Sequence, residues 1–255
     1  MTRVVGGWLT TTGRVDAYGG ISLSKEMIYV IADQTRAERG PIYVNHDTTQ
    51  ALPMRYTLVD VREHPSGELG VYVEFEVEDD NHDLNQYHAF SISFIGNPIP
   101  PDPSSDKPRI CLYVDAGCFE DGVYESAVQA LEAHFAVGTG KLYQFSVDVP
   151  IVVIIEFART VLVDLPAALF NGILFEVLKS KFLKRGESDK ETTVRMNVKG
   201  PEGTIRTVVK TNSPEVLDKA LESFKTVALA AQGNTLLVFD EQAGQWESGD
   251  LPPTT

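Results

Sequence analysis

Cysteine is scarce in this sequence, because only Cys111 and Cys118 occur among its 255 residues. Two cysteines cannot form the disulfide framework of a small secreted domain, and their spacing matches no zinc-binding pattern. The first residues, Met-Thr-Arg-Val-Val-Gly-Gly-Trp, also lack the apolar stretch of a signal peptide. We therefore expect a protein of the reducing cytoplasm.

Basic residues are few as well. The sequence has 22 Lys and Arg against 36 Asp and Glu, which gives a formal charge of -14. A field of that sign repels phosphate backbones and anionic lipid, so nucleic acid is not an expected partner. One basic cluster is present, at Lys179, Lys181, Lys184 and Arg185. Cations suit the C-terminal end of a helix, so we interpret this cluster as a solvated helix end.

The most apolar part of the chain, residues 150–183, contains no uncharged run long enough to span a membrane. Charged residues interrupt it, among them Glu156, Arg159, Asp164 and Glu176. We predict a buried helical hairpin that is broken near Pro166. A helix lying in a membrane interface is the alternative.

Strand patterns dominate the first hundred residues. In residues 71–77, apolar residues alternate strictly with Tyr and Glu, which is the pattern of a half-buried strand. We predict two further strands over residues 56–61 and 90–95, and a turn over residues 64–68. The predicted fold class is α+β, with an N-terminal, mostly antiparallel β-barrel-like domain.

The rest of the chain mixes strands and helices. Prolines crowd residues 98–108 and predict an exposed loop. A strand over residues 110–114 and a helix over residues 123–137 follow, and Gly138 is expected to end the helix.

The last third predicts a small β-β-α-β module. Two strands over residues 192–199 and 204–210 are joined by a Gly-Pro-Glu-Gly turn, a helix begins at Ser213, and a strand covers residues 236–239. We therefore divide the chain into a β-rich protease-like domain (1–149), an apolar helical segment (150–185) and an adaptor-like α+β module (191–250).

Several well-known motifs are missing, namely the P-loop, the dinucleotide-binding Gly-rich turn, the zinc protease helix and the nucleophile elbow. No cofactor or metal is therefore expected. Two features could carry chemistry instead. His46 follows the apolar residues 41–44, and a histidine at a strand end can act as a general base. Its flanking Asn and Asp are also typical of an ordinary turn.

Ser91 and Ser93 lie in Phe-Ser-Ile-Ser-Phe, residues 90–94, where strand alternation places both serines on one face. A serine on a strand beside a histidine on a neighbouring strand could be the nucleophile of an acyl transfer. The alternative is the polar face of an ordinary strand. A second Asn-His-Asp, residues 81–83, sits in an acidic loop that could bind a divalent cation or simply form a solvated turn.

Taken in order, four segments resemble the phage prohead (capsid maturation) protease family, which is related in fold to the herpesvirus assemblins. They are Pro-Ile-Tyr-Val-Asn-His-Asp (41–47), Pro-Met-Arg (53–55), Gly-Val-Tyr-Val-Glu-Phe-Glu (70–76) and Phe-Ser-Ile-Ser-Phe (90–94). The resemblance covers about residues 20–95 and implies a serine endopeptidase on a β-barrel, with His46 as base and Ser91 as nucleophile.

This sequence departs from the family pattern at Ser93, where the family has a glycine, and the departure bears on the backbone geometry that would bind an oxyanion. Ser93 could itself be the nucleophile, because it shares a strand face with Ser91. Asp115 or Glu120 could orient the histidine, and the sequence does not select between them.

The C-terminal third is similar to small effector-associated domains of bacterial conflict (antiphage) systems, which are adaptor-like. The leading hypothesis is a serine endopeptidase in a phage or antiphage context that acts on a protein substrate. The alternative is a non-catalytic scaffold whose protein partners dock on its acidic surface or on apolar residues 150–183. A phage structural component, which would assemble in solution, is a third hypothesis, and the chain can form oligomers under any of them.

Overall fold

The structure is a computed structural model that describes residues 2–15, 21–38, 43–44, 47–51, 54–78, 90–91, 93–115, 119, 121–144, 151–183 and 191–249. It divides into two compact units. The N-terminal unit comprises Met1–Gly96, Tyr143–Val149 and Asp250–Thr255, and the C-terminal unit comprises Asn97–Leu142 and Pro150–Gly249. The mixed α+β class predicted from the sequence is confirmed.

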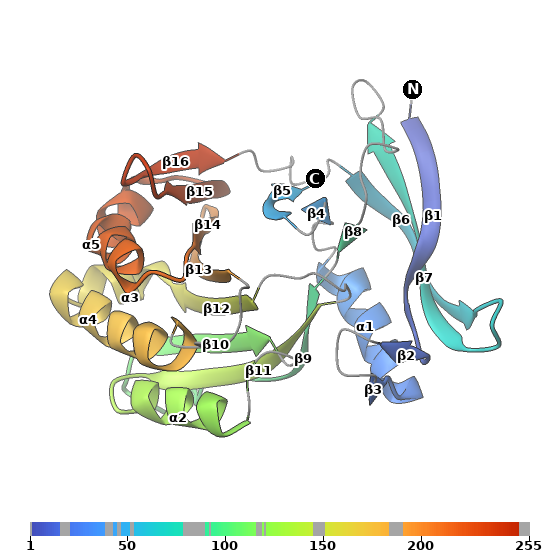
Figure 1. The fold of residues 1–255 in the computed structure, drawn as a ribbon, viewed down its shortest axis with the longest axis horizontal. Helices are drawn as coiled ribbons and strands as arrows, with labels where there is room; N and C mark the ends of the chain where they lie inside the picture. Colours follow the sequence, from blue (N-terminus) through green and yellow to red (C-terminus); the bar gives the residue numbers. More distant parts are fainter. Residues whose placement is uncertain are drawn as a thin grey trace. The chain divides into compact units, whose positions relative to one another are not determined.

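The C-terminal unit is built on an eight-stranded mixed sheet (Figure 1) with the order β16-β15-β14-β13-β12-β10-β11-β9. The strands are β9 (Ser93–Ile99), β10 (Arg109–Asp115), β11 (Ala136–Gln144), β12 (Ile151–Ala158), β13 (Thr192–Gly200), β14 (Gly203–Lys210), β15 (Thr235–Asp240) and β16 (Gln245–Gly249). Three parallel neighbours, β10/β11, β12/β13 and β14/β15, are each joined through helices, while β13/β14 and β15/β16 are antiparallel hairpins.

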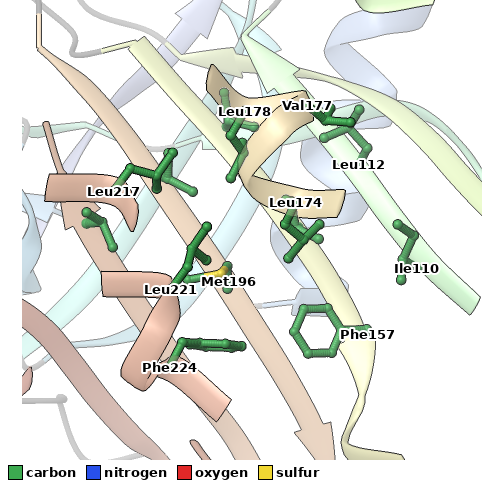
Figure 2. Packing of buried hydrophobic residues seen from close by; sticks show 14 of the residues in the cluster. Ile110, Leu112, Phe157, Leu174, Val177, Leu178, Met196, Leu217, Leu221 and Phe224 are labelled. Carbon is green, nitrogen blue, oxygen red and sulfur yellow. The ribbon is translucent and has the colours of Figure 1, made fainter. Parts of the chain in front are cut away.

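One layer of helices packs on one face of this sheet. The helices are α2 (Asp121–Glu132), α3 (Arg159–Asp164), α4 (Ala167–Val177), the π-helical turn η3 (Leu178–Leu183) and α5 (Pro214–Ala230). Figure 2 shows the core between the two layers, where Phe157 and Met196 of the sheet meet Leu174 of α4 and Phe224 of α5. Aromatic rings run through this core, and Phe170 and Phe224 stack with 6.2 Å between ring centroids.

The predicted helical hairpin is wrong over residues 151–158, which form strand β12. The run Ile-Val-Val-Ile-Ile is β-branched and pairs with β10 on one side and β13 on the other, and Ile151–Ile155 are buried on both faces of the sheet. A continuous apolar run of this kind fits a central strand as well as a buried helix. The predicted break at Pro166 is confirmed, because α3 ends at Asp164 and Pro166 is the N-cap of α4.

In its described residues, the N-terminal unit contains small antiparallel sheets and one helix. Strands β1 (Thr2–Thr11), β7 (Leu69–Glu78) and β6 (Met54–Glu63) form the largest sheet, in the order β1-β7-β6. Helix α1 (Lys25–Glu38) packs on that sheet through a compact core: Ile28, Ile31, Ala32, Tyr56, Val71, Val73 and Phe75. The strands predicted over residues 56–61 and 71–77 are confirmed as parts of β6 and β7.

Two further sheets of this unit are short. Strands β2 (Arg14–Val15) and β3 (Ile21–Ser22) form a pair, and β5 (Asp47–Ala51), β4 (Tyr43–Val44) and β8 (Phe90–Ser91) form a three-stranded sheet. Within the described residues, hydrogen bonds thus join the strands of this unit into separate sheets rather than into one closed barrel.

The two compact units do not coincide with the predicted division into residues 1–149, 150–185 and 191–250. Strands β10 and β11 belong to the same sheet as β12 to β16, so residues 97–142 group with the C-terminal part of the chain. The predicted β-β-α-β elements are present as β13, β14, α5 and β15, and a further strand, β16, continues the sheet. Gly138 does not end a helix, because α2 stops at Glu132 and Gly138 lies inside β11.

Candidate functional site

Strand β8, which contains Ser91, is hydrogen-bonded to β4 in the N-terminal unit. The two strands are antiparallel, and Tyr43 is opposite Ser91 while Val44 is opposite Phe90. The sequence led us to expect a serine on a strand beside the strand that leads to His46. The backbone pairing of β4 with β8 has that arrangement.

His46 itself lies outside the described residues, together with Asn45. The residues on either side are described: Val44 ends β4, Asp47 begins β5, and these two are paired with each other. Only two residues therefore link β4 to β5, and His46 is the second of them.

Ser93 begins β9, one residue after β8 ends at Ser91. The backbones of both serines are described, whereas their side chains and the intervening Ile92 are not. Of the two candidates for the orienting group, Asp115 ends β10 in the C-terminal unit and is buried, with 3% of its surface exposed. Glu120 lies outside the described residues.

The other histidines have different surroundings. His64 lies in the turn before β7, where its Nδ1 accepts the Ser66 backbone N–H at 3.1 Å and the Trp8 ring lies edge-on at 4.8 Å between centroids. These contacts give His64 a structural role in the turn. His134 is exposed just after α2, and the acidic loop that holds residues 81–83 is outside the described residues.

A polar group that sequence reasoning missed lies on the sheet face opposite the helices of the C-terminal unit. Register places Cys111 of β10 opposite Glu156 of β12, which is opposite Asn197 of β13. The Glu156 carboxylate accepts the Asn197 amide at 2.9 Å and pairs with Lys199 at 2.7 Å. Strand alternation could have indicated this group, because Cys111, Glu156 and Asn197 each lie directly between two core residues in the sequence. Their side chains must therefore lie on the face opposite the core.

The Cys111 thiol in this group is not an activated nucleophile. Burial has the largest effect and raises its pKa, a hydrogen bond with Tyr113 lowers it by less, and the smaller charge effects of Glu156 and Lys199 raise and lower it respectively. A thiol with a raised pKa is mostly protonated at neutral pH and reacts slowly. In this group, the half-buried Glu156 carboxylate is satisfied by Asn197 and by the exposed Lys199.

A cavity of about 210 Å³ lies at the end of the β13–β14 hairpin, between Arg159, Glu202 and Gln232. The Arg159 guanidinium donates to the carbonyl oxygens of Ala231, at 3.1 Å, and of Leu229. Those carbonyls belong to the C-terminal end of α5, where a cation stabilises the helix. Arg159 is thus occupied as a helix cap, and the cavity presents no convergent reactive groups.

Within the described ranges, no set of three or more His, Cys, Asp or Glu side chains is arranged to hold a metal ion. The same residues include no helix that is long and apolar enough to cross a membrane.

Comparison with protein-family models, with curated proteins and with solved structures finds no match for this chain.

Proposed function

We propose that the protein is a serine endopeptidase whose reaction centre is the β4–β8 pair of the N-terminal unit. The observation that carries the proposal is the pairing of Tyr43 with Ser91. Tyr43 lies three residues before His46 in the sequence. Three residues extend at most about 11 Å, so the chain tethers the imidazole close to the strand that bears the serine. This proposal treats the N-terminal unit as the protease domain of a cytoplasmic protein.

In the proposed reaction, the Ser91 hydroxyl oxygen adds to the carbonyl carbon of a peptide bond while His46 accepts the hydroxyl proton. The peptide C–N bond then breaks, and the amine leaves with the proton returned by His46. A water molecule then adds to the acyl ester while His46 accepts its proton. The ester C–O bond breaks, the product acid leaves, and His46 returns the proton to the Ser91 oxygen. Backbone N–H groups near Ser93 would bind the oxyanion.

The test is active-site labelling with a fluorophosphonate, followed by mapping of the modified residue. We expect one labelled serine, Ser91, with labelling lost in Ser91→Ala and slowed at least about 100-fold in His46→Gln, because loss of a general base costs that much. Ser93→Ala keeps the label if Ser91 is the nucleophile and loses it if Ser93 is.

Ser104 is the matched control, since it is an exposed serine in the proline-rich loop and should not react. Equal labelling of the unaltered protein and of the double variant Ser91→Ala/Ser93→Ala would contradict the proposal. Absence of any labelled serine would favour the non-catalytic scaffold.

A further inference from the structure

A side chain of helix α1 is hydrogen-bonded to the strand that begins at Ser93. Residues 93–96, at the start of β9, belong to the N-terminal unit together with α1. The side-chain amide of Gln34 donates to the backbone carbonyl oxygen of Ile95. Ile95 lies two residues after Ser93 and four residues after Ser91 in the sequence. The hydrogen bond therefore acts on the backbone next to both candidate nucleophiles.

The core of the N-terminal unit holds α1 at the turn that bears Gln34. Ile28 and Ile31 of α1 are buried against the sheet of β6 and β7. Gln34 follows Ile31 by three residues, so the two side chains are neighbours on the surface of the helix. Between the core and β9, Gln34 is thus a direct connection through one side chain.

A second contact holds the same part of β9. A Cβ at Gly96 would lie 2.6 Å from the Tyr143 ring, so this ring packs directly against the Gly96 backbone. Tyr143 belongs to the N-terminal unit and packs against its core. Two successive residues of β9, Ile95 and Gly96, are therefore each held by a side chain of another element.

The amide of Gln34 is only half satisfied. Its Oε1 atom is buried and has no hydrogen-bond partner in the part of the chain that the structure describes. A buried acceptor without a partner costs free energy, which an unbranched apolar side chain such as Met would avoid. What Gln34 provides and Met cannot is the N–H donor to Ile95.

We infer that Gln34 is a positioning residue of the proposed reaction centre, an inference that rests on the proposed function. Its hydrogen bond to Ile95 holds the start of β9, where backbone N–H groups near Ser93 would bind the oxyanion. Such donors stabilise the transition state most when they are fixed in place before the reaction. Gln34 therefore acts on the rate of the chemical step and leaves substrate binding unchanged.

The first experiment measures the rate of fluorophosphonate labelling in Gln34→Met. We expect the maximal rate at saturating reagent to fall about tenfold or more, because small displacements of reacting groups have effects of this size. The concentration for half-maximal rate and the final stoichiometry should not change, whereas a misfolded fraction would lower the stoichiometry. Urea unfolding should show little change in stability, since the variant removes one unpaired oxygen and deprives another, that of Ile95, of its donor.

Arg36→Met is the matched control. The Arg36 Nε donates to the Val59 carbonyl oxygen at 3.0 Å, so the same helix binds the backbone of β6 in the same way. Because β6 bears neither candidate nucleophile, the labelling rate should stay at that of the unaltered protein. Hydrogen exchange at residues 93–96 should become faster in Gln34→Met and remain unchanged in Arg36→Met.

The second experiment uses Gln34→Glu to restore the donor. An ionised carboxylate only accepts hydrogen bonds, whereas the protonated acid has one O–H donor. The labelling rate of Gln34→Glu, divided by that of the unaltered protein at the same pH, should therefore rise toward one as the pH falls. This ratio cancels the protonation of His46, which both proteins share. The same ratio for Gln34→Met should not change with pH.

Several outcomes would overturn the inference and leave the proposed function standing: full-rate labelling in Gln34→Met, equal slowing in Arg36→Met, unchanged exchange at residues 93–96, or no recovery of Gln34→Glu in acid. Absence of any labelled serine in the unaltered protein would overturn the proposed function and this inference together.

Discussion

The two units bury their apolar residues in different ways. The C-terminal unit has one continuous sheet with its helices on a single face, and aromatic residues such as Phe157, Phe170 and Phe224 join strands and helices in one core. In the N-terminal unit a single helix covers a three-stranded sheet, and the other described strands are short. A small core with few buried apolar contacts has a lower free energy of local unfolding than a large contiguous core. We therefore expect the unit that contains the proposed reaction centre to open more easily than the other.

The largest expected effect is that of Phe224→Ala in the C-terminal unit. Phe224 is fully buried and contacts the rings of Phe157 and Phe170, so its loss leaves a cavity that rigid neighbours cannot fill. We expect a loss of about 3–5 kcal/mol in the free energy of unfolding. Hydrogen exchange should report it as reduced protection in β12, β13 and α5.

The matched change in the other unit is Ile31→Ala on α1, where Ile31 is 1% exposed. We expect a loss of about 2–3 kcal/mol in the free energy of unfolding. This is the lower part of the range for such changes, because α1 can move to fill the space. The exchange should increase in α1, β6 and β7. If Ile31→Ala costs more than Phe224→Ala, the contrast between the two cores is wrong.

A pair of Tyr→Phe changes should have opposite signs in the two units. Tyr56 is 8% exposed in the N-terminal core, and its hydroxyl has no hydrogen-bond partner in the part of the chain that the structure describes. Tyr124 in the C-terminal unit accepts the Gly140 N–H at 3.0 Å. We expect Tyr56→Phe to stabilise by about 1 kcal/mol and Tyr124→Phe to destabilise by a similar amount, measured by urea unfolding.

Alkaline pH provides an independent check on Tyr56. Burial raises the pKa of its hydroxyl well above the ordinary value, so the folded chain keeps a proton that the unfolded chain loses. Stability should therefore fall as the pH rises above about 10, and Tyr56→Phe should reduce that fall. An unchanged pH dependence in Tyr56→Phe would argue against a buried, unpaired hydroxyl.

An effect of similar size is expected at the serine caps of α1 and α5. The Ser213 hydroxyl accepts the Val216 N–H at 3.3 Å and donates to the Glu215 carboxylate at 2.7 Å, whereas Ser24 accepts the Met27 N–H at 3.2 Å. Each Ser→Ala change should cost about 1 kcal/mol, measured by thermal unfolding.

Both caps should depend on pH, because each serine hydroxyl helps to lower the pKa of a glutamate in the first turn of its helix. At α1 the backbone lowers the pKa of Glu26 most and the hydrogen bond with Ser24 comes second. The hydrogen bond from Ser213 is the largest cause that lowers the pKa of Glu215 below its ordinary value of 4.5. A lowered pKa in the folded state gives stability above that value, which is lost as the pH falls through the folded pKa. The cost of Ser213→Ala should therefore shrink in acid, and a cost that stays constant down to acid pH would contradict this assignment.

The sequence predicted the elements with clear local signals. Alternation defined β7, and Ser213 with Pro214 defined the start of α5. Helix α1 was missed, although Ile28, Ile31 and Thr35 have helical spacing, because strand patterns surround it. Strand β12 was assigned as helix because a segment buried on both faces has no polar positions to show its period.

For the candidate site, the sequence predicted that a histidine-bearing and a serine-bearing segment are neighbours, and β4 pairs with β8. Local patterns cannot provide more, because the direction of a side chain beyond a strand end depends on turn geometry rather than on alternation. The Glu156 group was missed because its members come from strands whose pairing depends on the whole sheet.

The chain passes from one unit to the other four times, after Gly96, Leu142, Val149 and Gly249. During synthesis, the N-terminal unit therefore has to wait for residues 143–149 and 250–255, both of which are made after β10 and α2. A cut at any single position cannot release either unit whole. Fragments meant to isolate the proposed reaction centre should be made by joining residue 96 to residue 143 through a short linker.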